Sequence, residues 1–254
     1  MKRAYVVDAA RTAVGKFGGT LSTVRPDDLG ADVIKALVAR NSSIDLNEIE
    51  DVVFGAANQA GEDNRNVARM SLLMAGLPVT VPGLTINRLC ASSLQAIADV
   101  SKNIAIGYGD MFIAGGVESM TRAPFVLPKA ESAYSRAGQV YDTSIGWRFI
   151  NPKLSALYHP HTMGETAENI AEKYGITRQE QDEFAYKTQL NYQNALNANK
   201  FENEIIPVHI PQRKGDALVF QQDEHPRLST VDQLSKLSAA FKSGGTVTAG
   251  NASG

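Results

Sequence analysis

The single cysteine of the chain, Cys90, is the residue best placed to do covalent chemistry. It lies in TINRLCASSLQAI (85–97), where a strand pattern passes through a short turn into a helical pattern. At such a helix start, unpaired N–H groups and the helix dipole stabilise a thiolate, the nucleophilic form of cysteine. Small residues at 91–93 leave room for a substrate carbonyl, and the backbone N–H of Cys90 is placed to face an oxyanion. The pattern alone leaves two interpretations equally open, a nucleophile and an inert buried thiol.

Histidine is the other residue type that could carry chemistry. The chain has four histidines, and we expect His161 and His225 to be surface loop residues rather than ligands. The sequence shows no metal-ligand spacing of histidine, cysteine or carboxylate residues. We therefore predict no metal site.

The composition is that of an ordinary globular protein. The 254 residues are 43% hydrophobic and 20% charged, with a formal net charge of −2. This net charge does not attract nucleic acid, and the sequence has no run of five or more basic residues, so nucleic-acid binding is not favoured. One cysteine cannot form an internal disulfide, which fits a reducing compartment. There is no secretory signal and no apolar stretch of about 18 residues, so we expect a cytoplasmic protein without a membrane span.

Hydrophobic periodicity predicts the elements that must position Cys90. In the first 120 residues, strand patterns alternate with helical patterns, which is typical of a mostly parallel sheet covered by helices. The expected strands are 4–10, 51–55, 83–87 and 110–116, and the expected helices are 27–40, 66–78 and 91–107.

Beyond residue 120 the pattern changes. Residues 121–161 have little periodicity, as in an irregular functional segment. A helix is expected over 162–175, and Thr177 with Glu180 forms a capping-box pattern that opens another. The remaining expected elements are a hairpin from 203–210 and 217–221, a helix over 229–237, and a strand running into a turn over 245–254. Since the chain stops in mid-turn, we expect it to be part of a longer protein.

Five motifs resemble those of thiolases and follow the order of that family. They are DAARTAVGKFGGTL (8–21), GEDNRNVARMSLLMAGLP (61–78), NRLCASSLQAI (87–97), AGGVESMTRAP (114–124) and GTVTAGNASG (245–254). NRLCASSLQAI is similar to the active-site segment of the family, in which Asn-Arg-X-Cys precedes small residues. Five motifs in the right order argue against a chance match.

The resemblance implies an α/β fold. We expect a thiolase-type layered core whose mixed sheet is covered by helices, with an inserted α/β loop domain that acts as a lid. Residues 1–120 are then the N-terminal core domain, 121–245 the loop domain over the CoA site, and 246–254 the start of the return to the core. The C-terminal half of the fold is absent from this chain.

The resemblance also implies an enzyme, an acyl-CoA C-acyltransferase that is typical of fatty acid metabolism. Cys90 matches the nucleophile that forms an acyl-enzyme. The reaction is thiolytic cleavage of a 3-ketoacyl-CoA or the reverse Claisen condensation of acetyl-CoA. CoA and acyl-CoA are substrates, no cofactor is expected, and thiolases are homodimers or homotetramers.

Five further residues match substrate-binding positions of the family. Met163 matches a loop-domain residue against the acyl end, Arg227 an arginine near the CoA nucleotide, and Phe241 an aromatic residue that packs on CoA. Ser253 matches a serine near the pantetheine, and Ala249 a small residue in the same tunnel. Judged by residue type alone, Arg227 is more commonly a solvated loop charge, and Met163 and Phe241 are equally well core residues. Ser253 alone is equally a turn residue.

The chain also departs from the family pattern. Ala91 and Ser93 stand where many relatives have glycine, and Thr162 occupies a position that is histidine in some acetoacetyl-CoA-specific members. TSIGWRFINPKL (143–154) resembles the β-ketoadipyl-CoA branch. Together these features favour a longer or polar acyl chain.

Three catalytic segments of the family do not occur in the chain. They are the Asn-Glu-Ala-Phe, Gly-His-Pro and Cys-X-Gly segments, which supply the base, the second cysteine and the oxyanion hole. The resemblance implies that these remaining catalytic residues lie beyond Gly254. The 254 residues are therefore expected to lack full activity. Two alternatives stay open, a ketosynthase-like condensing enzyme and a non-catalytic CoA-binding fragment.

Overall fold

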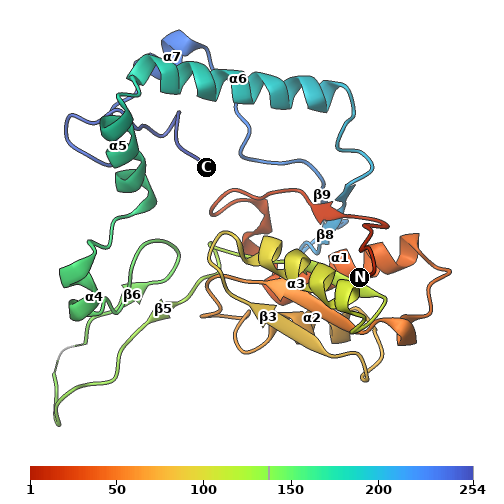
Figure 1. Cartoon of the computed structure of the whole chain (residues 1–254). Coiled ribbons are helices and arrows are strands. Elements are labelled where there is room, and N and C mark those ends of the chain that lie inside the picture. The colour runs from red at the N-terminus through yellow and green to blue at the C-terminus, as the bar shows by residue number, and fades with distance from the viewer. Residues whose placement is uncertain (137, 254) are drawn as a thin grey trace. The chain divides into compact units, whose positions relative to one another are not determined.

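The computed structural model of the protein describes residues 1–136 and 138–253 (Figure 1). Contacts between residues divide the chain into two compact units. Unit 1 comprises Met1–Ser144 and Glu204–Gln222, and unit 2 comprises Ile145–Asn203 and the chain from Asp223 onward. The expected domains, 1–120, 121–245 and 246–254, are continuous stretches of the chain, whereas each compact unit combines separate stretches. The expected domain boundaries stay predictions.

Helices and strands alternate in unit 1 as far as residue 116, and only strands follow among its described elements. Its described helices are α1 (Pro26–Arg40), α2 (Val67–Met74) and α3 (Ser92–Ile106), with short 3₁₀ helices at Thr20–Thr23 and Leu46–Glu48. Its described strands are β1 (Arg11–Thr12), β2 (Asp51–Gly55), β3 (Gly83–Ile86), β4 (Phe112–Gly116), β5 (Phe125–Val126), β6 (Tyr141–Asp142), β7 (Ile205–Ile206), β8 (Val208–Ile210) and β9 (Leu218–Phe220). The predicted helices 27–40 and 91–107 and strands 51–55, 83–87 and 110–116 are confirmed within two residues at each end. The helix expected over 66–78 ends earlier, at Met74, and Gly76 follows with a left-handed φ of 87°.

β2 lies at the centre of a parallel sheet with the strand order β3-β2-β4. Val53 pairs with Leu84 on one side and with Ala114 on the other. Parallel strands need a crossover connection, and α2 joins β2 to β3 while α3 joins β3 to β4. Because the strands run in one direction, their carboxyl ends meet at one edge, where the loops that follow them lie together.

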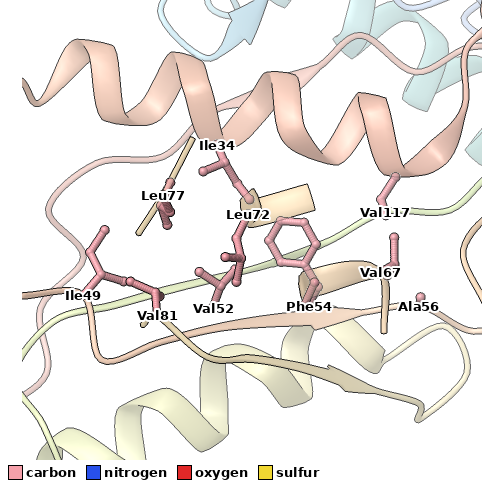
Figure 2. Close-up of a cluster of buried hydrophobic side chains, with 11 residues drawn as sticks. Ile34, Ile49, Val52, Phe54, Ala56, Val67, Leu72, Leu77, Val81 and Val117 are labelled. Atoms are coloured by element: carbon pink, nitrogen blue, oxygen red, sulfur yellow. The ribbon is translucent and has the colours of Figure 1, made fainter. Parts of the chain in front are cut away.

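β2 is covered on both faces, which explains its continuous apolar run. Val52 belongs to a core cluster with Ile34 of α1 and Leu72 of α2 (Figure 2). Val53 points to the opposite face and packs with Ala96 of α3. Successive strand residues alternate between faces, so α1 and α2 cover one face of the sheet and α3 covers the other.

The described helices of unit 2 are α4 (Pro152–Leu157), α5 (Met163–Tyr174), α6 (Arg178–Asn197) and α7 (Val231–Ser235). The capping box predicted at Thr177 and Glu180 is confirmed at the start of α6, and Thr162 with Glu165 forms another at α5. In each box the two residues accept each other's backbone N–H through their side chains. Across the described residues of both units, no helix combines the length and apolar character needed to cross a membrane.

The hairpin predicted from 203–210 and 217–221 is confirmed as the antiparallel pair β8 and β9. The strand expected at the start of the chain does not form. Segment 4–10 pairs with no described strand, although Val6 and Val7 are β-branched and 83% exposed. A strand is stabilised by hydrogen bonds and side-chain contacts with a neighbour, so β-branched residues alone do not produce one.

The last residues of the chain also differ from the expectation. In place of the strand expected within 245–254, the described residues 245–253 form turns and one isolated bridge from Thr248 to Ala239. Gly254, the residue beyond which the remaining catalytic residues are expected, lies outside the described residues. The placement of those catalytic residues beyond Gly254 stays a prediction.

Candidate active site

Cys90 occupies the turn between β3 and α3. The residue is exposed, so the alternative of a buried thiol is wrong. α3 begins at Ser92, and its N-cap residue, Ala91, supplies no side-chain hydrogen bond to the helix. The N–H groups of the first turn of α3 therefore lie near Cys90 without a side-chain cap.

Hydrogen bonds hold this turn in a strained shape. Leu89, directly before Cys90, has a φ of 50° in the left-handed region, which costs an L-residue about 1–2 kcal/mol. Asn87 Oδ1 accepts the N–H of Leu89 at 2.9 Å, and Ser92 Oγ donates to the Leu89 carbonyl at 2.5 Å. Asn87 Nδ2 donates to the Ala57 carbonyl at 2.7 Å, which ties the turn to the loop after β2. These bonds offset the strain and set the backbone direction at Cys90.

Two glycines at strand ends let α3 approach the sheet closely. A Cβ placed on Gly55 would lie 2.3 Å from the backbone nitrogen of Ser93, and one on Gly116 would lie 2.1 Å from Ser93 Oγ. Glycine, which has no Cβ, leaves room for the backbone of Ser93 at position 55 and for its side chain at position 116. The start of α3 therefore packs at the carboxyl ends of β2 and β4, the edge at which open parallel sheets bind ligands.

An ion-pair network lies in the loops that follow β2 and β4. Arg122 donates from Nε and Nη2 to the two carboxylate oxygens of Glu62, each at 2.5 Å, and Arg25 donates from Nη1 at 3.2 Å. The hydrogen bonds from Arg122 lower the pKa of Glu62, and the charges of both arginines act in the same direction. The network joins these loops at the same edge of the sheet as Cys90.

The other predicted site residues, Met163, Arg227, Phe241, Ala249 and Ser253, lie in unit 2. Met163 is the first residue of α5 and is 76% exposed, so the alternative of a core residue is wrong. Phe241 packs on Gly164, where an added Cβ would meet the ring at 2.1 Å. The structure thus brings Met163 and Phe241 to the same turn of α5.

A buried carboxylate anchors the segment that carries Ala249 and Ser253. Glu168 of α5 is 3% exposed and accepts the backbone N–H groups of Thr246 at 3.0 Å and Val247 at 2.8 Å. A buried carboxylate needs such donors because it has lost its water. Ala249 and Ser253 themselves are exposed.

A second carboxylate, Asp182 of α6, holds the same segment. It is 1% exposed and accepts from Arg178 Nε at 2.8 Å and from Asn251 Nδ2 at 2.9 Å. Asn251 Oδ1 in turn accepts the N–H of Thr248 at 2.7 Å. Neither Glu168 nor Asp182 belongs to the site residues predicted from the sequence. The signal in the sequence that could have indicated these two buried carboxylates is a carboxylate on the helix face that also carries apolar residues.

Arg227 lies in a loop near α6. Its backbone N–H donates to Gln189 Oε1 at 2.9 Å, and the residue is exposed. This placement fits both an anion-binding arginine and a solvated loop charge. Cys90 belongs to unit 1, whereas the other predicted site residues belong to unit 2.

Comparison with known proteins decides the family. The family described as "Thiolase, N-terminal domain" matches residues 4–254. This chain belongs to that family. The thiolase chain is 56% identical to the β-ketoadipyl-CoA thiolase of Acinetobacter baylyi, over all of this chain and 64% of that protein. It is 50% identical to the 3-oxoadipyl-CoA/3-oxo-5,6-dehydrosuberyl-CoA thiolase of Escherichia coli, with the same coverage.

A solved structure supports the same assignment. The crystal structure of the Bacillus anthracis acetyl-CoA acetyltransferase matches with a TM-score of 0.89 and 37% identity, over all of this chain and 63% of that one. The match confirms the expected thiolase-type α/β fold, and the family assignment confirms the resemblance of the motifs. The thiolase chain spans about 64% of the length of the curated relatives it matches.

Proposed function

We propose that this chain is the part of an acyl-CoA C-acyltransferase that carries the nucleophile, and that Cys90 is the nucleophile. The observation that carries the proposal is the exposed thiol between the carboxyl end of β3 and the start of α3. The N–H groups of the first turn of α3 stabilise negative charge on the thiolate and on a developing oxyanion. Exposure leaves the thiol open to a thioester substrate.

The first half-reaction transfers an acyl group to Cys90. Its sulfur attacks the carbonyl carbon of an acyl-CoA, a new carbon–sulfur bond forms, and the CoA thiolate leaves and takes up a proton. In condensation, the deprotonated α-carbon of acetyl-CoA then attacks the acyl-enzyme and releases the Cys90 thiolate. In cleavage these steps run in reverse, so Cys90 attacks the 3-keto carbon and the bond between C2 and C3 breaks. The acetyl-CoA carbanion that leaves takes up a proton at C2. CoA then removes the acyl group as a thioester.

We assign the substrate contacts to residues of unit 2. Met163 offers an exposed, flexible apolar side chain to the acyl group. Phe241, whose ring packs against the first turn of α5, offers that ring to the CoA. Arg227 presents an exposed guanidinium, a group well suited to phosphate. Ala249 and Ser253 supply small side chains beside the pantetheine.

The substrate that we propose is a 3-ketoacyl-CoA whose acyl chain ends in a carboxylate, as in β-ketoadipyl-CoA. Two relatives named for this substrate class are 56% and 50% identical to the chain, whereas the acetyl-CoA acetyltransferase is 37% identical. The segment 143–154 supports the same choice. Transfer between thiols needs no redox or metal group, so the proposal includes no cofactor. We also propose that the full-length protein is a homodimer or homotetramer and is located in the cytoplasm.

Acyl transfer to the chain tests this proposal. The protein is incubated with acetyl-CoA or β-ketoadipyl-CoA, and its intact mass is compared with that of the Cys90→Ala variant. We expect one acyl increment in the unmodified chain and none in the variant. An acyl increment of equal size in the Cys90→Ala variant would contradict the role of Cys90, whereas folded protein that gains no acyl group would show that the thiol needs the base expected beyond Gly254. Acylation from an acyl-carrier-protein thioester but not from CoA would instead support the ketosynthase alternative.

A further inference from the structure

Two histidines and a glutamate gather at the start of α5. His159, His161 and Glu165 each offer one ligand atom, and these atoms all lie within 4.8 Å of one another. The two imidazole rings have their centroids 4.4 Å apart and are tilted by 55°. Both histidines are exposed and Glu165 is half-buried. Imidazole nitrogen and carboxylate oxygen are donors that Zn²⁺ and related metals bind.

The backbone and the carboxylate of this group are already held in place. The N–H of His161 donates to the His159 carbonyl at 2.9 Å, and the His161 carbonyl accepts from Trp147 Nε1 at 3.2 Å. Glu165 Oε2 accepts from the N–H of Thr162 at 2.7 Å and from its Oγ1 at 2.9 Å. These hydrogen bonds fix the position of the carboxylate beside the two imidazoles.

The geometry needs only small changes to receive an ion. Zn²⁺ bonds of 2.0–2.1 Å in a tetrahedral site place ligand atoms about 3.4 Å apart. Rotation of exposed imidazoles about their side-chain bonds supplies this change. Because Thr162 holds Oε2 of Glu165, it acts as the outer support that orients a metal-binding carboxylate, while Oε1 accepts no hydrogen bond from the described residues.

We propose that His159, His161 and Glu165 bind one divalent transition-metal ion of the Zn²⁺ type, with water completing the coordination. The ion joins the loop at residues 159–161 to the first turn of α5, on either side of Met163. The sequence predicts no metal site because its histidine, cysteine and carboxylate residues show no recognised metal-ligand spacing. His159, His161 and Glu165 come together only in the folded chain. The proposed site lies within unit 2 and is independent of acyl transfer to Cys90.

Titration of the full chain with Zn²⁺ tests the site. Protein without a polyhistidine tag is stripped with a chelator and titrated by isothermal titration calorimetry. We expect one ion per chain, and chemical-shift changes at the imidazoles of His159 and His161. His161→Ala and Glu165→Gln should each weaken binding by at least about tenfold, the scale seen when metal sites lose even outer support. Glutamine also serves in capping boxes, so Glu165→Gln preserves the start of α5.

The chain offers matched controls. His209 and His225 are its other two histidines, and both are exposed. The His209→Ala/His225→Ala variant should keep the affinity of the unmodified chain, and so should Cys90→Ala, which removes the thiol. Affinity that survives His161→Ala would overturn the proposal, as would affinity lost in either control. Absence of binding at millimolar Zn²⁺ would overturn it as well.

Discussion

Glu168 of α5 accepts a 2.8 Å hydrogen bond from the backbone N–H of Val247, 79 positions later in the chain. Both oxygens of the same carboxylate also accept the N–H of Thr246, at 3.0 Å. Because Glu168 is 3% exposed, these donors replace the water that its charge has lost. The pairing therefore decides where the segment with Ala249 and Ser253 lies.

Replacing Glu168 by glutamine should loosen this segment. The variant loses an anionic acceptor and leaves a buried N–H group poorly paired, so the free energy of unfolding should fall by about 1–3 kcal/mol. Hydrogen exchange at the amides of Thr246 and Val247 should become faster. Glu172→Gln is the control, because Glu172 is exposed on the same helix and pairs with Lys242. An equal loss of stability in the two variants would show that Glu168 is not an anchor.

Replacing Gly55 by alanine should separate α3 from the sheet. The new Cβ would meet the backbone of Ser92 and Ser93 at 2.3–2.4 Å, so stability should fall by at least about 1–3 kcal/mol. Alkylation of Cys90 should change in rate because its turn moves with the helix. Gly115→Ala is the matched control, since its Cβ would meet the Phe54 ring at an ordinary 3.4 Å. Denaturant midpoints that fall equally in both variants would refute the close-packing argument.

Replacing Gly164 by alanine should displace the ring of Phe241, because the added Cβ would lie 2.1 Å from it. On the proposed function, this displacement should weaken CoA binding several-fold. Phe241→Leu should weaken binding similarly, and the double variant should be no worse than either single variant, since both act through one ring. Calorimetric titration with CoA measures these effects. Additive losses would mean that Gly164 does not act through Phe241.

Glu62 should make the stability of unit 1 depend on pH. Arg122 lowers its pKa below the ordinary value of 4.5. A carboxyl group whose pKa is lowered by folding adds stability above its unfolded pKa, and this contribution is lost as the pH falls through the folded pKa. The Tm of the unmodified chain should therefore fall more steeply below about pH 5 than that of Glu62→Gln. Parallel pH profiles for the two proteins would exclude this contribution.

Asp51 should have the opposite effect. Burial raises its pKa, and its Oδ1 atom has no hydrogen-bond partner among the described residues. A carboxyl group whose pKa is raised by folding destabilises the protein as the pH rises through its unfolded pKa. Asp51→Asn should therefore increase the free energy of unfolding at pH 7, and the gain should shrink as the pH approaches 4. Urea unfolding at both pH values checks this, and a less stable variant at pH 7 would disprove it.

The amino-acid sequence by itself determined the features whose signals are local. The apolar run 51–55, the helical spacing over 27–40 and the capping box of Thr177 and Glu180 each depend on residues within a few positions of one another. All three are confirmed. The setting of Cys90 between a strand and a helix is local in the same sense, and the ordered motifs were sufficient to indicate the thiolase family.

Only the tertiary structure decided the features that depend on distant residues. Residues 4–10 have the composition of a strand, but no described strand forms a ladder with them. Glu168 finds its donors 78 and 79 positions away, and the need for glycine at position 55 comes from the backbone of α3. Such contacts follow from how folded segments meet in space and leave no periodic pattern in the chain. For this reason the anchors of the candidate site became visible only in the fold.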